Sequence, residues 1–464
     1  MKNGQGKTKS HVKCPTAPRL CRWASGVVAC AIVAVVLAWL ATLLLPTPGD
    51  PLAKISLPVN EQQIKRGAYL ARVGDCVACH TAPGKAQFSG GEAIASPIGG
   101  MIPPNITPDK NTGIGSYTYG DFERAVRYGI APSGDTLYPA MPWTSYSRIT
   151  QDDMAALYAY FMHGVTPVVA PHQQDTIPWP FSLRWPMTWW RWLFAPKPLA
   201  TANLPTDPVE LGAYYVTGLG HCGACHTPRA ITLQEVAFDN HQGSQFLSGG
   251  QVIDGYSVPS IRGEQRSGLG QTRADEIVAL LKTGRSERTA TFGPMSDVVT
   301  HSTQYMSDGD LSAIATYLRS LSPSKNQDKP YYDLTTFNVL TRGGALPTGA
   351  KQYLSHCEGC HLSNGLGYKN KFPALALNTM VNNPDPGSLI KIVLNGATNT
   401  GTQHNETDYS MPAFANTLND EDIAEILSFI RSSWGNQASE VSASEVSEVR
   451  QNQAAPSPDA AHNP

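Results

Sequence analysis

The chain has 464 residues, a formal net charge of −2 and a hydrophobic content of 41%. This length suits about three domains of roughly 150 residues, each with enough apolar side chains for a core. Six basic residues stand in the first 22 positions, so the rest of the chain has 29 basic against 37 acidic residues, a formal −8. Nucleic-acid binders usually present a basic surface, so we expect no nucleic acid among the partners.

The first 45 residues predict export. Residues 1–22 hold the basic cluster and no acidic residue, and residues 23–45 are apolar and uncharged. As a helix, residues 24–45 would measure about 33 Å, which is enough to cross a bilayer. Basic residues before such a segment keep the N-terminus in the cytoplasm and place the body on the periplasmic side of the cytoplasmic membrane. The segment is either a membrane anchor or a signal segment, and its length favours the anchor.

The body repeats one unit three times, which we place at residues 60–165 (unit 1), 206–322 (unit 2) and 346–436 (unit 3). Each unit has a short opening helix, a Cys-x-x-Cys-His motif, a proline-containing turn, an amphipathic segment ending in glycine, and a longer closing helix. Apolar residues in these segments recur at every third or fourth position, the period of an α-helix. The pattern predicts an all-α fold of three tandem domains.

The closing helices share a spacing. Each has an aromatic residue seven positions after an aspartate, namely Tyr160, Tyr317 and Phe429. We expect these rings to pack against the opening helices, where a glycine allows close approach: Gly67, Gly212 and Gly349.

Three further segments connect or follow the units. The linker of residues 166–205 contains five of the nine tryptophans, so it is not a polar, flexible linker. It either packs between the domains or presents an aromatic surface to a partner or to the membrane interface. The linker of residues 323–345 is ordinary, and residues 437–464, rich in Ser, Ala, Gln and Pro, are predicted to be disordered.

The Cys-x-x-Cys-His motifs admit three kinds of chemistry. A redox dithiol needs no following histidine and belongs to alternating strands and helices, whereas a structural zinc site needs a fourth ligand from a second cluster. Covalent haem c attachment uses all three residues, because two thiols bond the vinyl groups and the histidine reaches the iron. Three copies in one helical frame therefore indicate three haems, bound by Cys76, Cys79, Cys222, Cys225, Cys357 and Cys360.

The same reasoning predicts the iron ligands. The proximal ligands are His80, His226 and His361, each with its second ring nitrogen held by a carbonyl in the proline turn, at Pro104, Pro259 and Pro373. A methionine before each closing helix would be the sixth ligand: Met141, Met295 and Met411. In unit 2, Met306 competes with Met295, but it stands where units 1 and 3 have Ile149 and Leu418, so we expect it in the core. An iron lacking a sixth ligand would instead indicate a peroxidase-like enzyme.

Several stretches carry a family resemblance, among them "PNITPDKNTGIG", "MPWTSYSRITQDDMAALYAYFMHGV", "GHCGACHTPR" and "FIRSSWGN". Over roughly residues 60–436 the chain resembles the triple-haem cytochrome c subunit of membrane-bound, quinone-reducing dehydrogenases. These include quinoprotein alcohol dehydrogenase and the flavoprotein gluconate and fructose dehydrogenases. The resemblance implies three tandem class I cytochrome c domains with the cysteine, histidine and methionine ligands given above.

The resemblance also implies a role. A quinoprotein or flavoprotein dehydrogenase subunit would oxidise an alcohol, sugar or sugar acid, and the haems would pass its electrons to ubiquinone at the cytoplasmic membrane. The chain is not expected to oxidise the substrate itself, and the substrate does not follow from the resemblance. A stand-alone multihaem enzyme and a diffusible multihaem carrier remain the alternatives.

Overall fold

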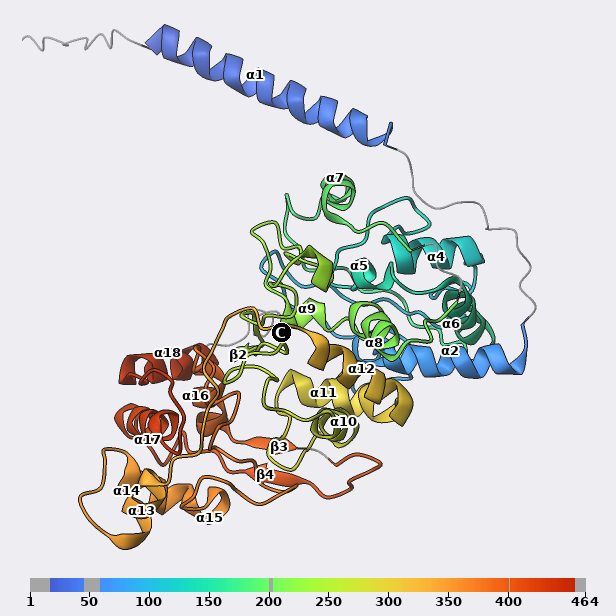
Figure 1. The fold of residues 1–464 in the computed structure, drawn as a ribbon. Helices are drawn as coiled ribbons and strands as arrows, with labels where there is room; N and C mark the ends of the chain where they lie inside the picture. The colour runs from blue at the N-terminus through green and yellow to red at the C-terminus, as the bar shows by residue number, and fades with distance from the viewer. Residues whose placement is uncertain (1–16, 46–58, 200–202, 400, 455–464) are drawn as a thin grey trace, which may run out of the picture.

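The computed structural model describes residues 17–45, 59–199, 203–399 and 401–454 of the chain, and Figure 1 shows their arrangement. The described residues form a mostly helical protein with two small antiparallel hairpins. One pairs β1 (Val252–Ile253) with β2 (Tyr256–Ser257), and the other pairs β3 (Ala397–Asn399) with β4 (Tyr409–Met411). The predicted helical fold is therefore confirmed, with these strands as short additions.

Units 1 and 2 follow the predicted order of segments. Unit 1 contains α2 (Glu61–Val73), α3 (Cys76–His80), α4 (Tyr119–Tyr128), α5 (Trp143–Tyr146) and α6 (Gln151–His163). Unit 2 contains α8 (Pro208–Thr217), α9 (Gly223–His226), the 3-10 helix η2 (Asn240–Gln242), α10 (Ala274–Thr283), α11 (Pro294–His301), the 3-10 helix η3 (Thr303–Tyr305) and α12 (Asp308–Ser320).

Unit 3 repeats the scheme with fewer helices. It contains α14 (Ala350–His356), α15 (Glu358–His361), α16 (Gly387–Asn395) and α17 (Asp420–Ser432), and the β3–β4 hairpin stands between α16 and α17. In the linker before it, α13 (Thr335–Arg342) has no buried residue.

The closing helices α6, α12 and α17 begin in the same way. A polar side chain caps each helix by accepting a hydrogen bond from the backbone of the third helical residue: Thr150 from Asp153, Ser307 from Asp310, and Asn419 from Asp422. An apolar residue precedes each cap and is buried: Ile149, Met306 and Leu418. Met306 is 2% exposed, so the predicted core role of this methionine is confirmed.

The opening and closing helices approach closely at the predicted glycines. A Cβ atom on Gly67 would lie 2.0 Å from the carbonyl oxygen of Ala156 and 2.6 Å from Cβ of Tyr160. A Cβ atom on Gly212 would meet Ala313 and Tyr317 at the same two distances. In unit 3, a Cβ on Gly349 would lie 2.1 Å from the carbonyl oxygen of Glu425. Any larger residue would force these helices apart, because protein interiors are close-packed.

Units 1 and 2 share one continuous core. Buried side chains of α2 and α6, such as Leu70 and Met154, belong to the same apolar cluster as Tyr215 of α8 and Leu311 of α12. Unit 3 has its own cluster, which includes Tyr353, Phe429 and Trp434. Units 1 and 2 therefore bury their apolar side chains together, whereas unit 3 buries its own separately.

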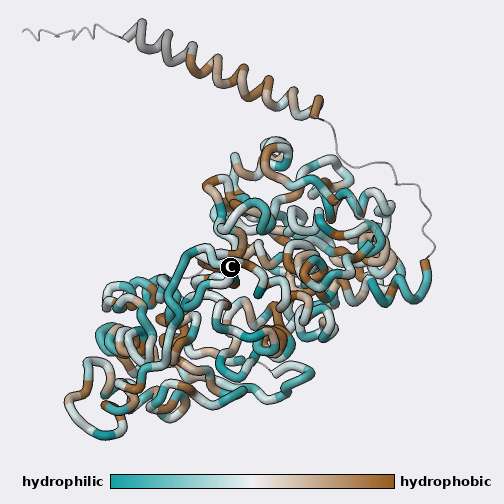
Figure 2. Tube along the Cα trace, in the orientation of Figure 1, coloured by the Kyte–Doolittle hydropathy of each residue, from teal (hydrophilic) through white to brown (hydrophobic). Residues whose placement is uncertain are grey.

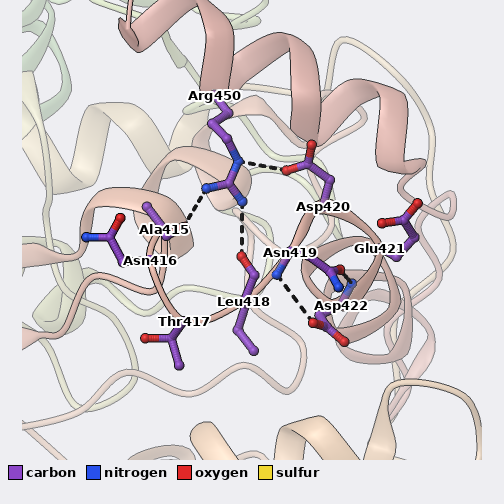
Figure 3. A pocket seen from close by; sticks show the side chains of 9 residues that line it. All are labelled: Ala415, Asn416, Thr417, Leu418, Asn419, Asp420, Glu421, Asp422 and Arg450. Carbon is purple, nitrogen blue, oxygen red and sulfur yellow. Dashed lines mark hydrogen bonds and ion pairs between the residues drawn. The ribbon is translucent and has the colours of Figure 1, made fainter.

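The predicted disorder of residues 437–464 is wrong for most of that segment. Residues Ala443–Ala454 form α18, and Val441 and Val446 are 5% and 0% exposed within the core of unit 3. Figure 3 shows Arg450 of α18 beside a surface pocket at the start of α17, where its side chain binds residues of unit 3. Its guanidinium donates to Asp420 Oδ1 at 2.7 Å and to the carbonyl of Ala415 at 2.6 Å. The buried valines and these hydrogen bonds stabilise the helix in spite of its polar composition. Residues 455–464 lie outside the described part of the chain.

The tryptophan-rich linker forms α7 (Trp185–Phe194), none of whose residues is buried. Trp190 joins the first two units, because its ring contacts Trp143 of unit 1 and its Nε1 donates to the carbonyl of Thr232 in unit 2 at 2.7 Å. Trp179 and Trp192 are 78% and 57% exposed. The linker therefore packs between the units and also presents an aromatic surface.

The N-terminal helix α1 (Ala17–Thr42) contains most of the apolar segment predicted at residues 23–45, and residues 1–16 lie outside the described residues. Figure 2 shows its described part as mostly hydrophobic, and Trp189 Nε1 of α7 donates to the carbonyl of Ala38 at 3.2 Å. Among the described residues, none of the helices combines the length and apolar composition needed to cross a membrane.

Candidate haem sites

Each Cys-x-x-Cys-His motif lies in a short helical turn directly after an opening helix. The chain leaves α2 and α8 through residues with positive φ, Asp75 at 51° and His221 at 35°, which turn it sharply into the motif. In units 2 and 3 the histidine N–H bonds the carbonyl of the first cysteine at 2.9 Å, one helical turn away. All six motif cysteines are free thiols that are half-buried or exposed.

The proline turns contact the motif histidines through the predicted carbonyl groups. Nδ1 of His80 lies 2.7 Å from the carbonyl oxygen of Pro104, and Nδ1 of His226 and of His361 lie 2.9 Å from those of Pro259 and Pro373. A carbonyl can only accept, so Nδ1 is the protonated donor in each ring. Nε2 therefore keeps its lone pair, which is what an iron ligand requires.

The surroundings favour the neutral imidazole. Burial lowers the pKa of His80, His226 and His361 below the ordinary value, with the proline carbonyl opposing this effect. At neutral pH the rings are uncharged and Nε2 is available. Burial also raises the pKa of the Cys76, Cys222 and Cys357 thiols to about 12, so they are not the reactive thiolates that a redox dithiol uses.

A glycine completes the support of each motif. The N–H groups of Gly90, Gly249 and Gly367 donate to the carbonyls of His80, His226 and His361 at 3.0, 2.7 and 3.1 Å. All three glycines have positive φ, at 114°, 73° and 59°. The sequence pattern shows a Gly–Gly pair in units 1 and 2 only, so it missed Gly367, which lies within the stretch "SNGLG".

The predicted sixth ligands lie in three different local structures. Met141 lies two residues before α5, Met295 is the second residue of α11, and Met411 ends β4. Met141 packs against the shared core of units 1 and 2, and Met411 against the core of unit 3. Met295 is half-buried and belongs to neither cluster, unlike Met306. All three predicted ligands are half-buried, whereas Met306 is buried, and ligation by Met141, Met295 and Met411 stays a prediction.

The motif residues fit a covalently attached haem. Each site offers two unpaired thiols one helical turn apart and a neutral imidazole with a free Nε2, and it repeats with the same carbonyl and glycine supports. A class I cytochrome c requires this donor set from its proximal side.

Comparison with known proteins agrees with this chemistry. The cytochrome c family model matches residues 347–434, within unit 3. The chain is 47% identical over 401 residues to the gluconate 2-dehydrogenase cytochrome c subunit of Pantoea cypripedii, covering 85% of this chain and 91% of that protein.

Two further relatives belong to other dehydrogenases. The cytochrome c subunit of alcohol dehydrogenase (quinone) from Gluconobacter oxydans is 43% identical, covering 84% of this chain and 83% of that protein. The fructose dehydrogenase cytochrome subunit of Gluconobacter japonicus is 37% identical, covering 87% of this chain and 84% of that protein. The chain therefore belongs to the family of cytochrome c subunits of membrane-bound, quinone-dependent dehydrogenases, and it binds haem c covalently through its Cys-x-x-Cys-His motifs.

Proposed function

We propose that this chain folds as three tandem class I cytochrome c domains and carries three haem c groups. The haems supply iron centres that each exchange one electron. The chain's part is to attach each group through its cysteine pair, to hold the proximal imidazole, and to close the opposite side with Met141, Met295 or Met411. A thioether ligand raises the potential of the iron and closes its sixth position.

The observation that carries this proposal is the repetition of one support at all three motifs. A proline carbonyl accepts from Nδ1 of the histidine, and a glycine N–H donates to the carbonyl of that same histidine. The bond to the second ring nitrogen orients an imidazole ligand and tunes its iron, and the glycine bond fixes the backbone of the same residue.

We propose further that the chain relays electrons from a partner dehydrogenase to ubiquinone. Oxidation of an alcohol or a sugar releases two electrons, and a quinone accepts them one at a time from single-electron centres. Relatives that serve alcohol, gluconate and fructose dehydrogenases support a quinoprotein or flavoprotein subunit as the partner. The basic N-terminus and the apolar segment that follows support a location on the periplasmic side of the cytoplasmic membrane.

The test is to purify the complex from membranes through a tag on this chain. We expect a dehydrogenase subunit to co-purify and to reduce a short-chain ubiquinone when its substrate is added. A variant with His226→Ala should lose ubiquinone reduction while the partner still reduces an artificial dye. A chain that purifies alone, and that turns over peroxide rapidly after reduction, would refute the relay and indicate a haem enzyme.

A further inference from the structure

A loop of unit 2 reaches across to unit 3. Residues 285–290 leave α10 at Gly284, turn back through the pairing of Arg285 with Ala290, and lead to Met295. The N–H of Thr291 donates to the carbonyl of Gly284 at 2.8 Å and closes the base of the loop. The loop is therefore followed, after residues 291–294, by the predicted sixth ligand of its own unit, while its residue Arg288 contacts the neighbouring unit.

On one side the loop holds the hairpin that carries Met411. Arg285 is 2% exposed, and its guanidinium donates to the side chain of Asn399 through Nε and to the Asn399 carbonyl through Nη2 at 2.9 Å. The same guanidinium lies 4.4 Å from the ring centre of Tyr409. Asn399 of β3 pairs with Tyr409 of β4, and Tyr409 lies two positions before Met411 in the same strand.

The side chain of Asn399 also donates hydrogen bonds to the base of the loop. Its Nδ2 donates to the carbonyl of Gly284 at 3.2 Å and to that of Thr291 at 3.1 Å. Asn399 is 8% exposed, so its amide is satisfied inside the interface. The loop and the hairpin are therefore fixed to each other from both directions.

On the other side the loop holds the turn that supports His361. The N–H of Ala374 donates to the carbonyl of Arg288 at 2.9 Å. The preceding residue is Pro373, whose carbonyl lies 2.9 Å from Nδ1 of His361. One short loop of unit 2 thus contacts the support of the proximal histidine and the strand of the predicted sixth ligand in unit 3.

We propose that Arg285 is a positioning residue for the haem of unit 3, although it belongs to unit 2. This inference rests on the proposed haem at the third motif and on its ligation by Met411. Arg285 fixes the Met411 hairpin, and it adds a buried positive charge beside that site. A nearby cation favours the reduced, less positive iron, and the orientation of axial ligands tunes the potential as well. Among the described residues, Nη1 of Arg285 has no partner, which leaves it able to donate to a haem carboxylate.

The test measures the three haem potentials of the full chain by spectroelectrochemical titration. Arg285→Met removes the charge and the fork of donors at similar length, and Arg285→Lys keeps only the charge. Lys391→Met is the matched control, because Lys391 also crosses from unit 3 to unit 2, bonding the Asp254 carbonyl and lying 4.3 Å from the ring centre of Tyr256. Met411→Leu identifies which of the three potentials belongs to unit 3.

We expect Arg285→Met to lower the potential that Met411→Leu also moves, with a smaller shift for Arg285→Lys and none for Lys391→Met. Unchanged potentials with three haems attached would overturn the inference and leave the proposed function standing. An equal shift in Lys391→Met would also overturn it, because any interface charge would then act alike. Fewer than three haems in the unmodified chain would instead refute the proposed function. If Arg285→Met does not accumulate, Arg285→Lys and Arg285→Gln decide by the same criterion.

Discussion

The hydroxyl of Tyr214, in α8 of unit 2, donates to Oδ2 of Asp153, in α6 of unit 1, at 2.7 Å. The reverse bond also exists, because the hydroxyl of Tyr69 in α2 of unit 1 donates to Asp310 in α12 of unit 2. Each tyrosine oxygen also faces the N-terminal end of the helix it reaches, near the N–H of Thr150 or of Ser307. The first two units are therefore joined by two equivalent tyrosine–aspartate hydrogen bonds, and each unit supplies the tyrosine of one and the aspartate of the other.

Removing one of these hydroxyls should loosen the pair of units. Tyr214→Phe should lower the free energy of unfolding by about 1–2 kcal/mol. The carboxylate of Asp153 is buried, at 3% exposed, and it would lose the hydrogen bond that the Tyr214 hydroxyl donates. Calorimetry should show a lower unfolding temperature for units 1 and 2 and an unchanged unfolding temperature for unit 3. Tyr158→Phe is the control, since that hydroxyl bonds within unit 1 to the carbonyl of Tyr117. Equal effects of both variants would contradict a special role for the contact between units.

Asp75 should make stability depend on pH. Burial and the nearby Asp297 raise the pKa of Asp75 to about 8, and its Oδ1 has no partner among the described residues. A carboxyl with a raised pKa stabilises the fold below its unfolded pKa of about 4, and this contribution is lost as pH rises toward 8. Asp75→Asn should therefore stabilise the chain by roughly 1–3 kcal/mol at pH 8 and little at pH 4. Asparagine also tolerates the positive φ at this position.

Thermal unfolding of the unmodified chain and of the Asp75→Asn variant, each at pH 4 and pH 8, checks this prediction. A stabilisation of the same size at pH 4 and pH 8 would mean that ionisation of Asp75 is not the cause.

The two methionines of unit 2 should behave differently. Met295→Leu should remove a thioether ligand and change the spectrum and potential of one haem, since Met295 holds the place in unit 2 that Met141 and Met411 hold in units 1 and 3. Met306→Leu should leave both nearly intact and cost under about 1.5 kcal/mol of stability, as volume-conserving core changes do. Absorption spectra and redox titrations of the two variants provide the measurement, and the reverse pattern would overturn the ligand assignment.

The linker tryptophans should separate folding from function. Trp190→Ala should reduce stability and haem content, because Trp190 contacts units 1 and 2. Trp192→Ala should leave both unchanged, because this side chain is 57% exposed, but it should lower ubiquinone reduction if the surface meets the partner or the membrane. Normal ubiquinone reduction in the Trp192 variant would leave inter-unit packing as the function of the linker.

Local patterns in the sequence were enough to predict the carbonyl groups that contact the motif histidines. The proline carbonyls, the close helix contacts at Gly67 and Gly212, and the core position of Met306 all follow from comparing three copies of one short frame. Such features depend on residues near one another in the chain, where helical period and turn chemistry fix the geometry.

Contacts between units could not be predicted in the same way. Tyr69 lies 241 residues from Asp310, and Arg285 lies 114 residues from Asn399, so no local period connects them. The helix α18 was missed for a related reason. Its polar composition resembles a disordered tail. The contacts that hold it against unit 3, namely the burial of Val441 and Val446 and the bonds of Arg450, are made with residues elsewhere in the chain.

The number of haems covalently attached to the intact chain tests the central claim most directly. Mass spectrometry of the purified protein, followed by peptide mapping of the motifs at Cys76, Cys222 and Cys357, gives both the number and the sites. The account predicts three haems, one on each cysteine pair. A chain carrying two or fewer, with free thiols at any of the three motifs, would contradict it.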